Sequence, residues 1–164
     1  MNKCDLTSAS ARKVIGLISD THGLLRPQAI AALAGVDLII HAGDIGKPAV
    51  LTELKKIAPV AAIKGNNDMG DWAERLPEYR SVKVGQHRLY VMHNVYELGF
   101  DPAARKFRVV ISGHSHKPAV VEKDGVLFIN PGSSGPRRFK LPVAVGKIFV
   151  DGPNIRAEII ELAI

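Results

Sequence analysis

The chain has 164 residues, of which 46% are hydrophobic, 23% charged and 5% aromatic, with 15 glycines and 10 prolines. These ordinary globular values exclude a chain that is disordered throughout, a collagen and a coiled coil, and the length predicts one domain with its own core. The 22 Lys and Arg against 16 Asp and Glu give a formal charge of +6, which favours anionic partners but equally suits solubility alone.

One cysteine excludes a disulfide framework. No apolar run reaches the roughly 18 residues of a membrane span, and the start of the chain, MNKCDLTSASARK, does not resemble a secretory signal. We therefore expect a cytoplasmic protein with no membrane association, whose residues 1–12 form a disordered extension.

The first half of the chain alternates buried strands with short helices. Continuous apolar runs predict strands at 14–20, 37–44 and 60–65, and proline-started helical patterns lie between them at 27–34 and 48–57. Strands that are buried on both faces belong to sheets covered by helices, so these three strands should be parallel.

The second half predicts more hairpins. It comprises a hairpin at 79–92 around Gly85-Gln86-His87, a short helix at 102–106, a buried strand at 108–113, and hairpins at 119–129 and 143–162. The sequence thus predicts one α/β domain whose second sheet is largely antiparallel.

Polar side chains that ligate metals follow five of these strands. They are Asp20, His22, Asp44, Asn66, His93, His114 and His116. The carboxyl ends of strands in an open α/β sheet meet at one edge, and residues two apart in an extended chain point to the same side. Gly43, Gly65 and Gly113 each precede a candidate ligand and would let the backbone approach an ion closely.

Carboxylate, amide and imidazole ligands without thiolate suit Mn, Fe, Zn or Ni better than Ca. Seven candidates exceed the needs of one tetrahedral ion and fit two ions that share a carboxylate. Each short ligand motif alone is weak evidence for a metal site. Their occurrence together, in order and each at the end of a separate strand, is strong evidence.

In this order the motifs D-x-H, G-D, G-N-x-[DE], H and G-H-x-H resemble the calcineurin-like metallophosphoesterase superfamily. The short chain and the motif Ile129-Asn130-Pro131-Gly132-Ser133 resemble its small YfcE-type phosphodiesterases. The resemblance implies a metallophosphoesterase-like αββα sandwich, in which two facing mixed β-sheets are flanked by helices, as a single domain over 13–164.

The resemblance also implies a role for each motif residue: Asp20, His22 and His116 on one metal, Asn66, His93 and His114 on the other, and Asp44 bridging the two. It implies two divalent ions, with Mn²⁺ favoured over Ni²⁺, Fe²⁺, Zn²⁺ or Mg²⁺, and a metal-bridging hydroxide that attacks a small phosphate ester. Asp44, Asn66 and His93 would then be catalytic through the metals.

Two positions depart from the family pattern. Many relatives have histidine where this chain has Asn67, which cannot act as a general acid but can hydrogen-bond a phosphoryl oxygen. We therefore expect either substrates with good leaving groups or a general acid elsewhere in the chain. Asn94 replaces the glycine that usually follows the fourth-motif histidine; asparagine tolerates the left-handed conformation, so the geometry should be kept.

Several other polar residues have plainer interpretations. His41 should be a packed, hydrogen-bonded histidine that could support the site from behind, His87 an exposed turn residue, and Asp68 a cap of the turn that follows it. The segment from Asn130 to Ser133 is first of all a tight turn after a strand; the resemblance implies that it packs beside the metal edge, where Ser133 or Arg137 would contact substrate.

Other functions remain open on the sequence. A non-catalytic protein-interaction scaffold on the same fold, a retromer-like subunit, is the main alternative, although the chain keeps all seven ligand positions. A nuclease or nucleotide phosphatase is another, but nucleic acid is disfavoured because no dense basic helix or aromatic-interleaved basic stretch accompanies the charge. A homo-oligomer is also compatible with the sequence.

Overall fold

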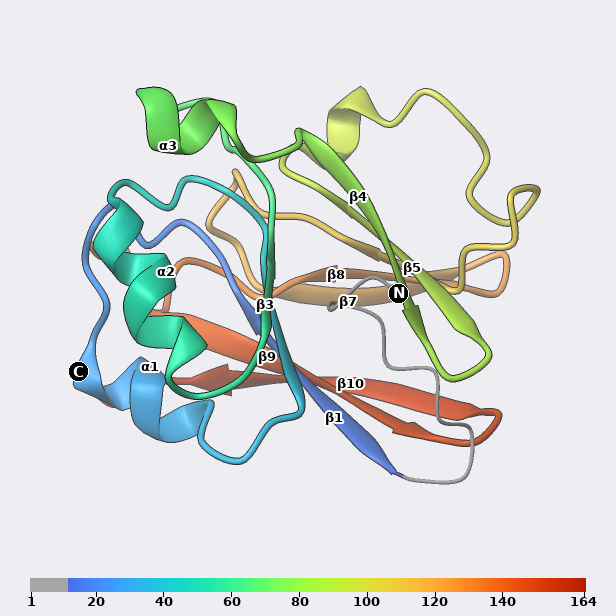
Figure 1. The fold of residues 1–164 in the computed structure, drawn as a ribbon. Coiled ribbons are helices and arrows are strands. Elements are labelled where there is room, and N and C mark those ends of the chain that lie inside the picture. Colours follow the sequence, from blue (N-terminus) through green and yellow to red (C-terminus); the bar gives the residue numbers. More distant parts are fainter. Residues whose placement is uncertain (1–11) are drawn as a thin grey trace.

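The computed structural model describes residues 12–164, which form two five-stranded β-sheets (Figure 1). The first sheet has the order β10 (Asn154–Glu161), β9 (Ala144–Asp151), β1 (Lys13–Ile18), β2 (Leu38–His41) and β3 (Val60–Ala62). The second has the order β4 (Tyr79–Val84), β5 (His87–Met92), β6 (Val109–Ile111), β8 (Val126–Asn130) and β7 (Ala119–Lys123). The extension expected over residues 1–12 lies, except for its last residue, outside the described part of the chain.

Two helices cover the outer face of the first sheet. α1 (Pro27–Ala32) and α2 (Pro48–Lys55) each begin with proline, whose missing N–H would have no partner in the first helical turn anyway. They connect β1 to β2 and β2 to β3, and both pairs are parallel, as the sequence predicts. Leu33 and Leu54 pack against Ile39 of the sheet, and each such buried side chain stabilises the fold by roughly 1.5–3 kcal/mol.

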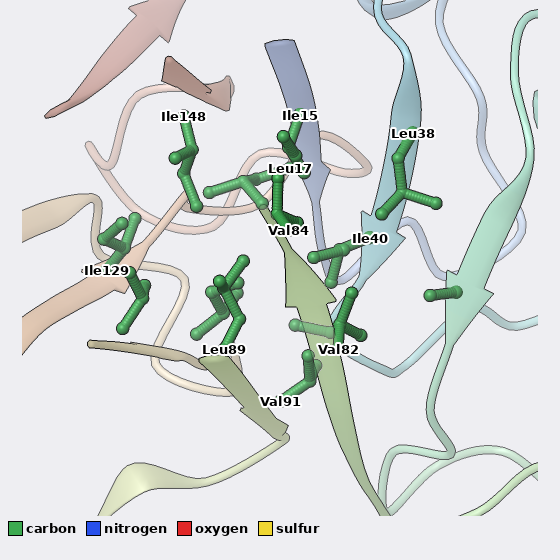
Figure 2. Close-up of a cluster of buried hydrophobic side chains, with 14 of the residues drawn as sticks. Ile15, Leu17, Leu38, Ile40, Val82, Val84, Leu89, Val91, Ile129 and Ile148 are labelled. Atoms are coloured by element: carbon green, nitrogen blue, oxygen red, sulfur yellow. The ribbon is translucent and has the colours of Figure 1, made fainter. Parts of the chain in front are cut away.

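The main core lies between the two sheets (Figure 2). Alternate residues of β1 and β2, such as Ile15 and Ile40, face Val82 and Leu89 from the second sheet, and all four are fully buried. The outer face of the second sheet is covered by a short 3-10 helix, η1 (Val95–Glu97), and the loop after it. This layered arrangement confirms the predicted sandwich of two mixed sheets.

The second sheet is less antiparallel than predicted. β6 pairs in parallel with both β5 and β8, and only the outer pairs, β4 with β5 and β7 with β8, are antiparallel. β6 is short and wholly buried, which is typical of a central parallel strand. The third predicted hairpin, β9 with β10, joins the first sheet through antiparallel pairing of β9 with β1.

The helix predicted at 102–106 is wrong, because this segment forms successive turns. The Asp101 side chain accepts a hydrogen bond from the Ala103 backbone N–H, and this local contact favours a turn over a helix. The sequence pattern missed α3 (Asp71–Glu74) and η1, which have only 4 and 3 residues. None of the helices among residues 12–164 is long and apolar enough to span a membrane.

Candidate metal centre

The candidate ligands gather where β1, β2, β3, β5 and β6 end. Backbone hydrogen bonds join these ends: Asp20 N–H donates to the Gly43 carbonyl at 3.0 Å, and Gly113 N–H donates to the His93 carbonyl at 2.9 Å. The second of these bonds joins the ends of β5 and β6. Because sheet pairing and these loop contacts fix every segment, the seven predicted residues occupy one edge of the sandwich.

The backbone at this edge adopts an uncommon conformation. Eight non-glycine residues between positions 12 and 164 have positive φ, and five of them are candidate ligands: Asp20 (54°), His22 (46°), Asp44 (55°), His114 (70°) and His116 (63°). A left-handed backbone is unfavourable for residues with a side chain and concentrates at functional sites, where the surrounding structure enforces it. The fold therefore turns these side chains sharply off their strands.

Asp20, His22 and His116 form a first group of ligand atoms. Asp20 Oδ1 lies 3.3 Å from His116 Nε2 and 3.8 Å from His22 Nε2. The two Nε2 atoms are 3.4 Å apart. Ligands about 2.1 Å from a tetrahedral ion lie about 3.4 Å from one another, so this triangle has the size that a small divalent cation requires.

The second group lies beside it. Asp44 Oδ2 is 3.3 Å from His93 Nε2, and these atoms and an Asp20 carboxylate oxygen all lie within 4.8 Å of one another. On the solvent side, Asn66 Oδ1 is 3.3 Å from His114 Nδ1, and the rings of His93 and His114 are 5.2 Å apart. The structure thus brings all the predicted residues of this group together.

Both carboxylates lie between the two groups. Asp44 Oδ2 is 3.8 Å from His22 Nε2 of the first group as well as 3.3 Å from His93 of the second. Asp20 Oδ1 likewise lies 3.9 Å from His93. Two adjacent cation positions would therefore share carboxylate oxygens.

Several buried polar atoms here have no partner. Among the described residues, the buried side-chain atoms without a hydrogen bond are Asp20 Oδ1, His93 Nε2, His116 Nδ1 and Ser134 Oγ. An unpartnered buried carboxylate oxygen or imidazole nitrogen is costly, by about 1–3 kcal/mol or more. Two of these atoms, Asp20 Oδ1 and His93 Nε2, are the ones that converge in the two groups, where a bound cation would satisfy both.

The three glycines before the ligands are required by close contacts. A Cβ on Gly65 would lie 2.1 Å from the Asp44 backbone nitrogen, and a Cβ on Gly113 would lie 2.6 Å from Asp20 Oδ2. A Cβ on Gly43 would lie 2.7 Å from His93 Nδ1. Any side chain at these positions would displace a candidate ligand.

The electrostatics keep Asp44 ionised. Burial alone raises the pKa of Asp44, but the adjacent His93 imidazole and the hydrogen bonds from the Asn67 backbone and side chain outweigh it and hold that pKa well below its usual range. Burial lowers the pKa of His93, but the Asp44 carboxylate, the Ala42 carbonyl and the charge of Asp20 outweigh this and raise it. The two carboxylates thus create a negative site that attracts cations.

Neighbouring side chains fix the ligands in place. Ser19 Oγ donates to Asp20 Oδ2 at 2.6 Å, and the Ala42 carbonyl, 2.7 Å from His93 Nδ1, fixes the orientation of the His93 ring so that its Nε2 faces the carboxylates. Asn67 donates to Asp44 Oδ2 from its side chain at 2.9 Å. Sequence reasoning missed Ser19, since a lone serine at a strand end carries no pattern.

Asp68 and His87 differ from expectation. Asp68 does not cap the following turn: its carboxylate accepts hydrogen bonds from the backbone N–H groups of Ile45, Gly46 and Gly65 and so clamps the loops after β2 and β3 together. His87 was expected to be exposed in its turn but is buried. Its Nε2 lies 2.9 Å from the Gly152 carbonyl oxygen in the β9–β10 hairpin of the other sheet.

Asn94 does not adopt the left-handed conformation that the sequence suggested. Its backbone is extended, with φ −118°, and its side chain accepts a hydrogen bond from Tyr96 N–H at the start of η1. His93 nevertheless reaches the site, because β5 ends in register with β6.

Ser133 is buried and supports the site from behind. Its hydroxyl donates to the Asp20 carbonyl at 2.9 Å and accepts from Gly135 N–H at 3.3 Å. These two backbone partners favour a positioning role over the expected contact with substrate.

Two cavities open on the ligands. One of about 520 Å³ is lined by Asn66, His93, Asn94 and His114, together with residues that the sequence did not single out: Lys64, Glu78, Tyr79 and Glu97. The other, of about 200 Å³, is lined by His22, His116, Pro136, Arg137 and Arg138. Arg137 thus lies beside the first group, where the sequence placed it.

Comparisons with known proteins found relatives of this chain. A family model described as the calcineurin-like phosphoesterase superfamily domain matches residues 14–150. A protein of Methanothermobacter thermautotrophicus named a probable metallophosphoesterase is 36% identical over 160 residues, which cover 90% of this chain and 92% of that protein. A phosphodiesterase of Methanocaldococcus jannaschii is 31% identical over 137 residues, 72% of this chain and 82% of that protein.

Solved structures share the fold. An archaeal phosphodiesterase superimposes with a TM-score of 0.74 at 26% identity, over 90% of this chain and 99% of that one. Vacuolar protein sorting 29 from Cryptosporidium parvum has a TM-score of 0.75 at 20% identity, over 93% and 99% of the two chains. YfcE, a phosphoesterase from E. coli, has a TM-score of 0.63 at 20% identity, over 92% and 100%.

Proposed function

Because this chain belongs to the calcineurin-like phosphoesterase superfamily, we propose that it is a phosphodiesterase that hydrolyses small phosphate esters with two divalent metal ions. The observation that carries the proposal is the pair of adjacent ligand groups sharing Asp20 and Asp44, in which Asp20 Oδ1 and His93 Nε2 are buried without a partner. Such a donor set of carboxylate, imidazole and amide oxygen fits Mn²⁺ well.

Each residue has a proposed task. Asp20, His22 and His116 would hold one ion, Asn66, His93 and His114 the other, and the Asp44 carboxylate would contact both. Two ions bound there would supply Lewis acidity toward the phosphoryl oxygens and lower the pKa of water for attack on phosphorus.

Hydrogen bonds from neighbouring groups orient the ligand side chains before a metal binds. The Ala42 carbonyl fixes the ring orientation of His93, and Ser19 and the backbone of His114 hold the second oxygen of Asp20, at 2.6 and 3.1 Å. Each bond leaves the opposite ligand atom facing the site. Orientation before binding reduces the entropy lost when the ions and the substrate bind.

Asn67 favours substrates with good leaving groups. Its side chain donates to Asp44 Oδ2 and has no proton to transfer to a departing alkoxide. Aryl esters, whose leaving group departs without protonation, should therefore react faster than alkyl esters. The amide also orients the Asp44 carboxylate that would contact both ions.

Metal titration together with an activity assay tests the proposal. Calorimetry should show two equivalents of Mn²⁺ bound, and the loaded protein should hydrolyse bis-p-nitrophenyl phosphate. His116→Ala and Asp44→Asn should each lower the rate by about 100-fold or more while leaving the circular dichroism spectrum unchanged. Glu97→Gln is a matched control that alters a cavity residue outside the ligand groups and should keep both ions.

The same experiment separates this function from a non-catalytic scaffold. The structural likeness to vacuolar protein sorting 29 is one of fold, at 20% identity. Binding of fewer than two ions with no hydrolysis would favour the scaffold, whereas retained activity in His116→Ala would show that the site is assigned to the wrong residues.

A further inference from the structure

The loop after the candidate ligands carries an exposed aromatic residue among cations. Arg137, Arg138 and Lys140 flank Phe139 in the sequence, and all four residues are exposed. Phe139 is 87% exposed, so its ring gains almost nothing from packing in this structure. An exposed phenyl ring between three cations is unusual on a surface selected only for solubility.

The backbone at Phe139 is also unfavourable for this residue. Its φ is +54°, and a hydrogen bond from Leu141 N–H to the Arg138 carbonyl at 3.1 Å closes a turn around it. Turn positions with positive φ favour glycine, asparagine or aspartate. Here a bulky side chain occupies such a position without being buried, which neither stability nor packing explains.

The loop is anchored to the metal edge at its base. Ser134 N–H donates to the Ser19 carbonyl at 3.2 Å, and the Arg26 guanidinium donates to the Gly135 carbonyl at 3.2 Å. A Cβ on Gly135 would lie 2.3 Å from the Thr21 carbonyl oxygen, so the chain passes directly against the end of β1. The loop therefore starts from a fixed point beside the ligands.

The cavity beside the first ligand group and the cavity beside the second differ in the charges that line them. The cavity of about 200 Å³ places Arg137 and Arg138 beside His22 and His116, and the next residues, Phe139 to Leu141, line an apolar hollow. The cavity of about 520 Å³ instead has two carboxylates, Glu78 and Glu97, against one cation, Lys64. An anion with an aromatic substituent should thus bind on the arginine side.

We propose that this loop binds the nucleoside portion of a nucleotide-type phosphodiester, with Phe139 stacked on the base and Arg137 and Arg138 beside the phosphate. The inference rests on the proposed function and adds the substrate class to it. A nucleotide combines in one molecule the anion and the planar ring that the loop is built to contact. Every base has a π-face, so such a contact would be tolerant of base identity.

The test compares two esters with the same leaving group. Thymidine 5′-p-nitrophenyl phosphate carries a nucleoside and methyl p-nitrophenyl phosphate does not, and both release p-nitrophenolate. Phe139→Ala should lower kcat/KM for the thymidine ester by about 5- to 150-fold, the range of one base–aromatic stack, and leave the methyl ester within about 2-fold. Phe139→Trp should keep the wild-type ratio.

Tyr96→Ala is the matched control. Tyr96 is an aromatic residue that is 89% exposed in η1 and should leave both rates unchanged. Equal effects of Phe139→Ala on the two esters, or no effect on either, would overturn the inference while leaving the phosphodiesterase intact. A wild-type protein that hydrolyses neither ester would overturn the proposed function itself.

Discussion

Replacing His41 by glutamine should remove part of the pH dependence of stability. The His41 side chain is fully buried, with Nε2 3.0 Å from Thr21 Oγ1 and Nδ1 accepting from Gly43 N–H at 3.2 Å. Thr21 donates its one hydroxyl hydrogen to the Ile45 carbonyl at 2.8 Å, so it accepts from His41. The ring is therefore neutral, with its proton on Nε2, and a second proton would meet the Gly43 N–H.

The size of this pH-dependent loss in the free energy of unfolding follows from the pKa of His41. Burial lowers the pKa of His41 from 6.5 to about 4, although Asp20 and Asp68 oppose the shift. Between these two pH values the unfolded chain binds a proton that the native protein does not, so the free energy of unfolding falls as the pH falls through this window. At 1.36 kcal/mol per pKa unit the full loss is about 3 kcal/mol, complete near the lower value.

Denaturant unfolding at a series of pH values measures this loss. A chelator is present throughout, so that metal binding does not contribute, and wild type is compared with His41→Gln. The other titrating groups are common to both proteins and cancel in the difference of the two slopes. The wild-type free energy should fall by about 1 kcal/mol more per pH unit in the window. Identical slopes would refute the neutral, buried state of His41.

Two further substitutions test the ligand edge. Gly113→Ala would place a Cβ 2.0 Å from Ser19 Oγ and 2.6 Å from Asp20 Oδ2, so it should lower the free energy of unfolding by more than about 2 kcal/mol and weaken metal binding. Gly99→Ala meets nothing within 4 Å and should change stability by less than about 0.5 kcal/mol, and denaturant unfolding compares the pair. Asn67→His should raise the rate on alkyl esters relative to aryl esters by about 10-fold or more, because it supplies a general acid; an unchanged rate ratio would exclude that role.

The position of the candidate ligands at one edge could be predicted because it follows from short, local sequence patterns. Each candidate follows an apolar run, and a run such as residues 37–44 predicts a buried strand without knowledge of its neighbours. Parallel strands place their carboxyl ends together, so Asp20 and Asp44 could be expected at one edge before any coordinates. The glycines before the ligands were predictable for the same reason, since close backbone approach requires the absence of a Cβ.

Contacts between segments that are distant in the chain could not be predicted from the sequence. Nothing near His87 indicates that it meets the Gly152 carbonyl of another sheet, and nothing near Asp68 indicates its backbone partners after β2. The hairpin of β9 and β10 has the same alternating pattern whichever sheet it joins, so its place beside β1 could not be read from residues 143–162. Alternating apolar and polar residues indicate that one face of a strand is buried, but they do not indicate which sheet or helix that face packs against.

The sequence by itself determined which chemical groups the site contains and the order in which strands deliver them, because both follow from residue type and local periodicity. Only the tertiary structure decided that Asp20 and Asp44 lie between two ligand groups, that Ser133 turns inward, and that Phe139 stands exposed beside the arginines. These features depend on contacts between segments as far apart as Asp20 and Ser133. Such contacts form only once both sheets have packed.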